Sequence, residues 1–135
     1  VLFVLFTLLN LNTLNFIKEL PISYLHVFSY SERDNTPAID FINKVDKTTK
    51  KERSKKLRIL SEKMQRDFYQ KNLESEHIAL FEQQDHNGLL YGFTENYIKV
   101  KIPFNKNIAK TKQHIKLLEI DSDGMMKAKI NSTKN

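Results

Sequence analysis

The chain has 135 residues, a formal net charge of +6 and no cysteine. That length can bury one medium domain, or a small domain plus part of another. The lack of cysteine excludes disulfides, a thiolate nucleophile, Cys-ligated zinc and an iron–sulfur cluster held by this chain. The histidines are scattered without a His-x-x-x-His pair, so we expect no metal site at His26, His77, His86 or His114.

The opening run, VLFVLFTLL, is apolar but much shorter than the roughly 20 residues that a membrane-spanning helix needs. No basic segment precedes it and no small-residue cleavage site follows it, which argues against a signal peptide. We therefore expect a soluble, intracellular protein with a buried strand over residues 1–6. The apolar start without an initiating Met favours a fragment of a longer chain.

A helix is expected next, capped by Asn10 or Asn12 and running to about Leu20. Residues 24–28 then form a second strand, buried on both faces, and Pro21 separates it from the helix. This βαβ-like unit should have parallel strands with a right-handed crossover. One such unit cannot cover its own sheet, so it should belong to a larger α/β domain.

A polar loop, residues 29–36, follows this strand and ends at Pro37. Ligands bind beyond the carboxyl ends of strands in α/β sheets, which makes the loop a candidate site. Arg33 is the best candidate for an anion contact because its guanidinium offers a planar fork of donors. The alternative is that Arg33 pairs locally with Glu32 or Asp34. His26 lies inside the strand and is interpreted as a core histidine rather than a catalytic one.

A long helix is predicted over residues 47–71, where ten Lys and Arg residues stand against three acids. This excess indicates a polyanionic partner, with RNA or DNA first, although a solvated helix face is the alternative. An apolar stripe and an opposite basic face follow from the helical spacing. The stripe is Leu57, Leu60, Met64 and Phe68, and the basic face is Lys51, Lys55, Arg58 and Arg66. A membrane-surface or calmodulin-target role is disfavoured because the apolar face has no Trp.

After Asn72 the hydrophobic period changes from helical to alternating, which predicts five short strands. They cover residues 77–82, 89–93, 97–102, 114–120 and 125–130, with tight turns at 85–88 and 121–124. The pattern is typical of a small five-stranded antiparallel OB-like barrel. In the third strand, Ile98, Val100 and Ile102 should face the core.

Three segments together resemble the C-terminal part of radical S-adenosylmethionine tRNA methylthiotransferases, the MiaB/MtaB-like family. They are FIKELPISYLHVFSYSERDNTPA (16–38), KKERSKKLRILSEKMQRDF (50–68) and LLYGFTENYIKVK (89–101). The likeness is greatest to the branch acting on threonylcarbamoyladenosine. The family's Gly-Phe-Pro-Gly-Glu segment is missing, since VLFVLFTLLN stands in its place.

The resemblance implies an α+β architecture in three parts. Residues 1–45 would be the last βαβ piece of a partial α/β radical SAM barrel, 46–71 a basic linker helix and 72–135 a TRAM barrel. It also implies that the parent enzyme uses S-adenosylmethionine and two 4Fe-4S clusters, whose cysteines this chain lacks. The chain would bind no cofactor alone and would supply an active-site rim through Tyr30, Ser31, Arg33 and Thr36, with His26 nearby.

The barrel residues expected to face RNA are Tyr91, Asn96, Tyr97, Lys99 and Lys101. Aromatic rings stack on unpaired bases and lysines neutralise phosphates, which suits looped RNA. Core positions are the alternative for Tyr91 and Phe93; we favour the core for Phe93 and the surface for Tyr97. The implied partners are the anticodon-loop region of tRNA and the upstream cluster-binding domains, in the cytoplasm, with no membrane and no DNA.

Two functions therefore remain open from sequence alone. One is the C-terminal, tRNA-binding part of a tRNA methylthiotransferase. The other is a free-standing TRAM-type RNA-binding module without catalytic activity.

Overall fold

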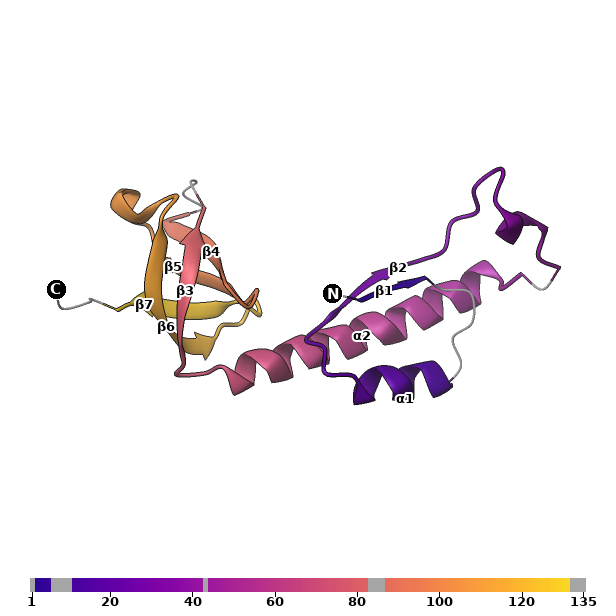
Figure 1. Cartoon of the computed structure of the whole chain (residues 1–135), viewed down its shortest axis with the longest axis horizontal. Coiled ribbons are helices and arrows are strands. Elements are labelled where there is room, and N and C mark those ends of the chain that lie inside the picture. Colours follow the sequence, from indigo (N-terminus) through magenta and orange to yellow (C-terminus); the bar gives the residue numbers. More distant parts are fainter. Residues whose placement is uncertain (1, 6–10, 43, 83–86, 132–135) are drawn as a thin grey trace. The chain divides into compact units, whose positions relative to one another are not determined.

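The computed structural model describes residues 2–5, 11–42, 44–82 and 87–131 (Figure 1). The chain divides into two compact units, Val1–Gln65 and Arg66–Asn135. The boundary lies inside a long helix, and the division into 1–45, 46–71 and 72–135 stays a prediction. The expected cap at Asn10 and the turn residues Asp85 and His86 lie outside the described residues. Asn12, the other expected cap, lies inside the helix Leu11–Glu19 and not before it.

The first unit begins with a strand, a helix and a second strand: β1 (Leu2–Leu5), α1 (Leu11–Glu19) and β2 (Leu25–Phe28). The two strands pair in parallel, with Leu2 opposite Leu25 and Leu5 opposite Phe28, which confirms the expected parallel pairing. The chain turns between α1 and β2 at Pro21, where the Ile22 amide donates to the Leu20 carbonyl.

Only one face of β2 is buried, because α1 and the long helix α2 (Lys47–Lys71) supply the core that this face meets. Leu25 packs with Ile17, Leu57 and Leu60, whereas Phe28 on the other face is 62% exposed. The expectation that the strand is buried on both faces is wrong. His26 is also exposed, so its interpretation as a core histidine is wrong too.

Helix α2 has the predicted bounds and starts at a cap that the sequence reading missed. Asp46 accepts hydrogen bonds from the Thr49 amide at 2.9 Å and the Thr49 hydroxyl at 2.6 Å. These bonds satisfy donors of the first turn and lower the pKa of Asp46. A short 3₁₀ helix, η1 (Pro37–Asp40), precedes the cap and was also not predicted.

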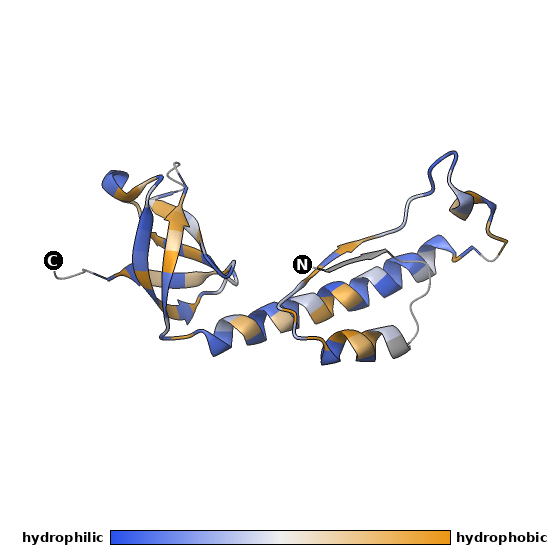
Figure 2. Ribbon diagram, in the orientation of Figure 1, coloured by the Kyte–Doolittle hydropathy of each residue, from blue (hydrophilic) through white to orange (hydrophobic). Residues whose placement is uncertain are grey.

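The apolar residues of α2, coloured orange in Figure 2, pack into two different cores. Leu57, Leu60 and Met64 pack in the first unit, where the Ser61 hydroxyl also bonds to the backbone of Leu25. Phe68 packs against the core of the second unit. No helix in the described part of the chain is both long and apolar enough to cross a membrane.

The second unit is a closed barrel of five strands in the order β3-β4-β5-β7-β6. They are β3 (Glu76–Phe81), β4 (Leu89–Thr94), β5 (Lys99–Pro103), β6 (Lys112–Ile120) and β7 (Met126–Ile130). A second 3₁₀ helix, η2 (Lys106–Ile108), lies between β5 and β6.

The expectation of a fully antiparallel barrel is wrong, because β5 and β7 run parallel. The reason is geometric: strand directions cannot alternate all the way around a closed ring with an odd number of members. One neighbouring pair must be parallel, and the remaining four pairs are antiparallel.

The barrel core confirms the predicted inward positions of Ile98, Val100 and Ile102. Helix α2 closes this core through Tyr69, whose hydroxyl accepts a hydrogen bond from the Lys99 amide at 3.0 Å. Gly92 is required where β4 pairs with β3, since a Cβ atom there would lie 2.5 Å from the Leu80 carbonyl oxygen.

Candidate functional site

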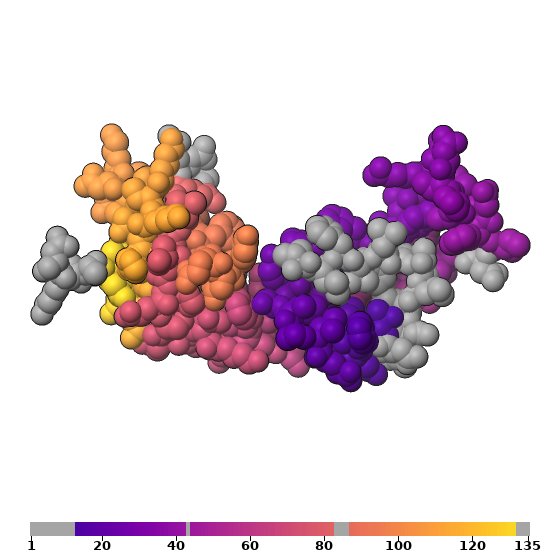
Figure 3. Space-filling view, in the orientation of Figure 1, coloured from indigo at the N-terminus to yellow at the C-terminus, as the bar shows by residue number. Residues whose placement is uncertain are grey.

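The loop after β2 forms a cavity of about 530 Å³ that collects all four residues predicted for the rim. It is lined by Phe28, Ser29, Tyr30, Ser31, Arg33, Thr36 and Ala38. The Thr36 hydroxyl donates to the Arg33 carbonyl at 2.8 Å and fixes the turn of the loop. In the space-filling view this loop forms a knob at the surface of the first unit (Figure 3).

Arg33 does not pair with its acidic neighbours. Glu32 instead forms an ion pair with Lys44 at 3.4 Å, and within the described residues Arg33 has no ion pair. The alternative in which Arg33 only caps the loop through Glu32 or Asp34 is therefore not what the structure shows. Its guanidinium is exposed and lines the cavity.

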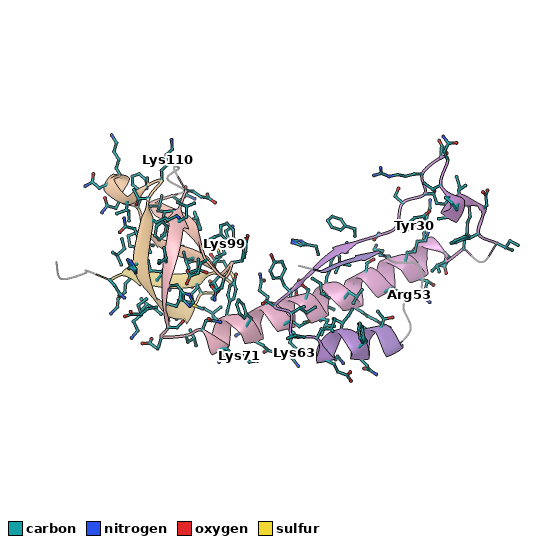
Figure 4. All side chains as sticks on the ribbon, viewed as in Figure 1. Tyr30, Arg53, Lys63, Lys71, Lys99 and Lys110 are labelled. Atoms are coloured by element: carbon teal, nitrogen blue, oxygen red, sulfur yellow. The ribbon has the colours of Figure 1, made fainter. Side chains whose placement is uncertain are left out.

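A second cavity of about 480 Å³, here called the basic cavity, lies between this loop and the first turns of α2. Its lining residues are Ser29, Tyr30, Ser31, Glu32, Lys47, Lys50, Lys51 and Arg58. Its lining contains two predicted RNA contacts, Lys51 and Arg58, together with two predicted rim residues, Tyr30 and Ser31. Figure 4 shows Tyr30 where the loop leaves β2 over the start of α2.

Sequence reasoning missed Lys47 and Lys50 as members of this site. The helical spacing from Lys47 to Lys51 places both on one face of α2, so the pattern could have identified Lys47. Lys55 and Arg66 are exposed on α2 but do not line the cavity.

On the barrel, the ammonium of Lys99 lies close to two aromatic rings, here called the aromatic cluster. The Lys99 Nζ lies 5.7 Å from the centre of the Tyr91 ring and 6.0 Å from that of Phe93. Phe93 is 43% exposed, so our assignment of this ring to the core is wrong. The inward positions of β4 next to it belong to the small residues Gly92 and Thr94.

Tyr97 is 69% exposed, as expected. It lies directly after a turn, and its backbone φ angle is 65°. Asn96 has structural partners. Its side-chain oxygen accepts from the Thr94 hydroxyl at 2.6 Å, and its amide donates to Asn72 at 3.2 Å. These bonds hold the turn that presents Tyr97.

Lys101 was expected to lie on the RNA-facing surface, but the residue is buried, with only 7% of it exposed. Its ammonium forms ion pairs with Asp121 at 2.6 Å and with Asp123 at 2.5 Å. Lys101 does lie on the outer side of β5, as alternation requires, but the turn between β6 and β7 carries these two aspartates over it. This lysine stabilises the barrel and has little surface left for another ligand.

The same ion pairs shift the acidity of their members. The hydrogen bond from Lys101 lowers the pKa of Asp121 to about 2, assisted by the Ser122 amide. The hydrogen bonds that Lys101 donates to Asp121 and Asp123 raise the pKa of Lys101. A carboxylate with a lowered pKa stabilises the fold above its ordinary pKa of 3.8, and that contribution is lost as the pH falls toward 2.

We therefore expect Asp121→Asn to lower the midpoint of urea unfolding at neutral pH. The decrease of this midpoint between pH 4 and pH 2 should also be smaller than in the wild type. Urea unfolding of the full chain at a series of pH values measures this. Asp67→Asn, which changes an exposed carboxylate on α2, is the control and should keep the slope of the wild type. An Asp121→Asn variant with the pH dependence of the wild type would contradict the role given to this ion pair.

An exposed apolar pair beside these aromatic rings was not predicted. Leu80 on β3 lies directly opposite Phe93 on β4, and both side chains are exposed together with Ile78. The sequence of β3 could not reveal this, because the inward residues Ala79 and Phe81 are apolar as well.

The donor set of the chain does not fit an iron–sulfur cluster, since it contains no cysteine. In the described part of the chain, no group of three His, Asp or Glu side chains is placed to hold a metal ion.

No family model matches the chain. It is 41% identical over 98 residues to the threonylcarbamoyladenosine tRNA methylthiotransferase MtaB of Aquifex aeolicus, covering 73% of the chain and 23% of that protein. It is 37% identical over 95 residues to MtaB of Bacillus subtilis, covering 67% and 21%. The ribosomal protein uS12 methylthiotransferase RimO of Alkaliphilus oremlandii is 33% identical over 76 residues, covering 56% and 17%.

The chain thus spans about a fifth of the length of the curated relatives it matches. MtaB proteins and RimO proteins are both methylthiotransferases by name. The chain belongs to the MiaB/MtaB-like methylthiotransferase family.

Proposed function

We propose that the chain is the C-terminal, tRNA-binding portion of a tRNA methylthiotransferase that adds a methylthio group to threonylcarbamoyladenosine near the anticodon. The observation that carries this proposal is the similarity to MtaB. Three MtaB proteins match at 36–41% identity over 67–73% of the chain, whereas the RimO matches reach 32–33% over 53–56%.

The barrel, in this proposal, is a TRAM domain that binds looped RNA. Its contribution is the aromatic cluster of Tyr91, Phe93 and Lys99, with exposed Tyr97 on the neighbouring turn. Rings of this kind stack on unpaired bases, and a lysine between them neutralises a phosphate. Lys101 is not part of the surface, because Asp121 and Asp123 bind it.

The exposed cations of α2 extend the RNA contact along the helix. Lys51, Lys55, Arg58 and Arg66 are all exposed, and in the described part of the chain none of them forms an ion pair. Exposed cations without acidic partners are available to replace the counterions of RNA phosphates.

The loop after β2 supplies the rim of the active site, through Tyr30, Ser31, Arg33 and Thr36. The proposal places S-adenosylmethionine and the two 4Fe-4S clusters on domains outside these 135 residues, because the chain has no cysteine to hold a cluster. The activity would then take place in the cytoplasm, where this part of the enzyme positions the tRNA.

A chimera tests the proposal directly. The matched 95 residues of Bacillus subtilis MtaB are replaced by those of this chain, and the tRNA of cells that lack MtaB is analysed by mass spectrometry. We expect methylthiolated threonylcarbamoyladenosine to reappear. A parallel chimera in RimO of Alkaliphilus oremlandii should leave uS12 unmodified.

A chimera that folds and yet leaves the tRNA unmodified would contradict the proposal. Should the isolated chain still bind RNA in that case, the second candidate, a free-standing TRAM-type RNA-binding module, would be favoured. The absence of cysteine and the presence of the exposed aromatic cluster are compatible with that candidate.

A further inference from the structure

The basic cavity between the loop after β2 and the start of α2 has a strong excess of positive charge. Three lysines and one arginine line it, whereas Glu32 is the one acid in its lining. The Glu32 carboxylate is already bound by Lys44, which lies outside the cavity. The cavity therefore favours an anionic ligand.

Two contacts tie the loop to α2 beside this cavity, and one of them holds a lysine near the loop. The Lys50 Nζ lies 5.4 Å above the centre of the Tyr30 ring, a cation–π contact that keeps the ammonium near the loop. The Ser29 and Ser54 hydroxyls are 3.0 Å apart and join the loop to α2. Within the described residues, neither Lys47 nor Lys50 forms an ion pair.

One residue that lines this cavity, Tyr30, carries a hydroxyl without a hydrogen-bond partner among the described residues. The Tyr30 Oη is buried and has no partner within the described residues. Buried polar atoms are nearly always bonded in proteins, so an orphan of this kind points to a missing ligand or water. The residues that line the cavity carry ammonium, guanidinium and hydroxyl groups, the kinds of donor from which phosphate oxygens accept.

We propose that the basic cavity binds a phosphate group, and that in the functional protein this group is a phosphodiester of the RNA backbone. The inference rests on the proposed function for its RNA, but the site itself is new. It assigns Lys47, Lys50 and Tyr30 to phosphate binding, beside Lys51 and Arg58. A backbone phosphate fits better than a free nucleotide because exposed Lys55 continues the basic face of α2 beyond the cavity.

The NMR signal of the Tyr30 ring provides a direct readout of phosphate binding in the basic cavity. The full chain is labelled with ¹³C in its tyrosine rings, and Tyr30→Phe identifies the Tyr30 signal. Inorganic pyrophosphate and a single-stranded RNA oligonucleotide are then titrated separately. We expect both to shift the Tyr30 signal.

The variant Lys47→Ala with Lys50→Ala should abolish the Tyr30 shift and weaken RNA binding on the order of tenfold at about 0.1 M salt. The matched control, Lys56→Ala with Lys63→Ala, removes the same charge from exposed positions of α2 outside the cavity and should keep the shift. Tyr30→Phe preserves the ring beneath Lys50, so it tests the hydroxyl alone and should weaken pyrophosphate binding several-fold.

The outcomes separate the two proposals. RNA that saturates the chain without moving the Tyr30 signal would overturn the phosphate site and leave the proposed function standing. If the wild type binds no RNA, the proposed function fails. A Tyr30 shift with pyrophosphate alone would then overturn the assignment to RNA and make the cavity a site for free phosphates.

Discussion

Replacing Gly92 with alanine is expected to destabilise the barrel by about 3 kcal/mol, the upper part of the range for adding a group to a packed core. The new Cβ would lie 2.5 Å from the Leu80 carbonyl oxygen and 2.9 Å from the Phe81 Cδ1 atom. The Leu80 oxygen belongs to the backbone of β3, so it cannot move away without distorting the pairing of β3 with β4. Urea unfolding of the full chain, followed by far-UV circular dichroism, measures the loss.

Gly124 provides the matched control for this substitution. It has a φ of +78° and no neighbour within 4 Å of an added Cβ atom. Asparagine tolerates that backbone conformation, so Gly124→Asn should cost less than about 1 kcal/mol. Equal unfolding midpoints for Gly92→Ala and Gly124→Asn would contradict the close approach of β3 and β4.

The largest effect on binding is expected from removing the basic face of α2. The variant with alanine at Lys51, Lys55, Arg58 and Arg66 should bind tRNA on the order of 100-fold more weakly at about 0.1 M salt. The slope of log K against log salt should flatten by roughly 3 units, because each lost contact with a single-stranded phosphate accounts for about 0.7. Fluorescence anisotropy over a salt series gives both quantities.

A charge-retaining variant controls for damage to the helix. Exchanging lysine and arginine at the same four positions keeps every charge and should preserve the salt slope. Circular dichroism should show helical content similar to the wild type in both variants, since alanine favours helices. An alanine variant that keeps the affinity and slope of the wild type would show that α2 is only a solvated surface.

The sequence predicted helix α2 well because its signals are local. Leu57, Leu60 and Met64 repeat at helical spacing, and the observed bounds are Lys47–Lys71. The stripe could not reveal that Phe68 belongs to a different core from Leu57, because that depends on which segment packs against each turn. The parallel pairing of β1 with β2 also followed from a local rule, the connection through one helix.

The wrong predictions concern burial that depends on distant residues. Lys101 alternates correctly along β5, yet its exposure is decided by Asp121 and Asp123 in a turn about twenty residues later. The core position favoured for Phe93 is wrong because Gly92 and Thr94, the residues on either side of it, are the ones that point inward on β4.

The candidate site was predicted in part for the same reason. Tyr30, Ser31, Arg33 and Thr36 are neighbours in the chain, so one loop was enough to bring them together. Lys47 and Lys50 join them because α2 folds back beside this loop. The helical spacing groups Lys47 with Lys51, but no local pattern reveals which loop this face meets.

The measurement that tests the central claim most directly is a titration of the 135-residue chain with an anticodon stem-loop RNA that carries threonylcarbamoyladenosine. Fluorescence anisotropy should show saturable binding that weakens as salt increases, and a DNA hairpin of the same sequence should bind more weakly. No binding at low salt, or equal binding of the RNA and the DNA hairpin, would contradict a tRNA-binding role for this chain.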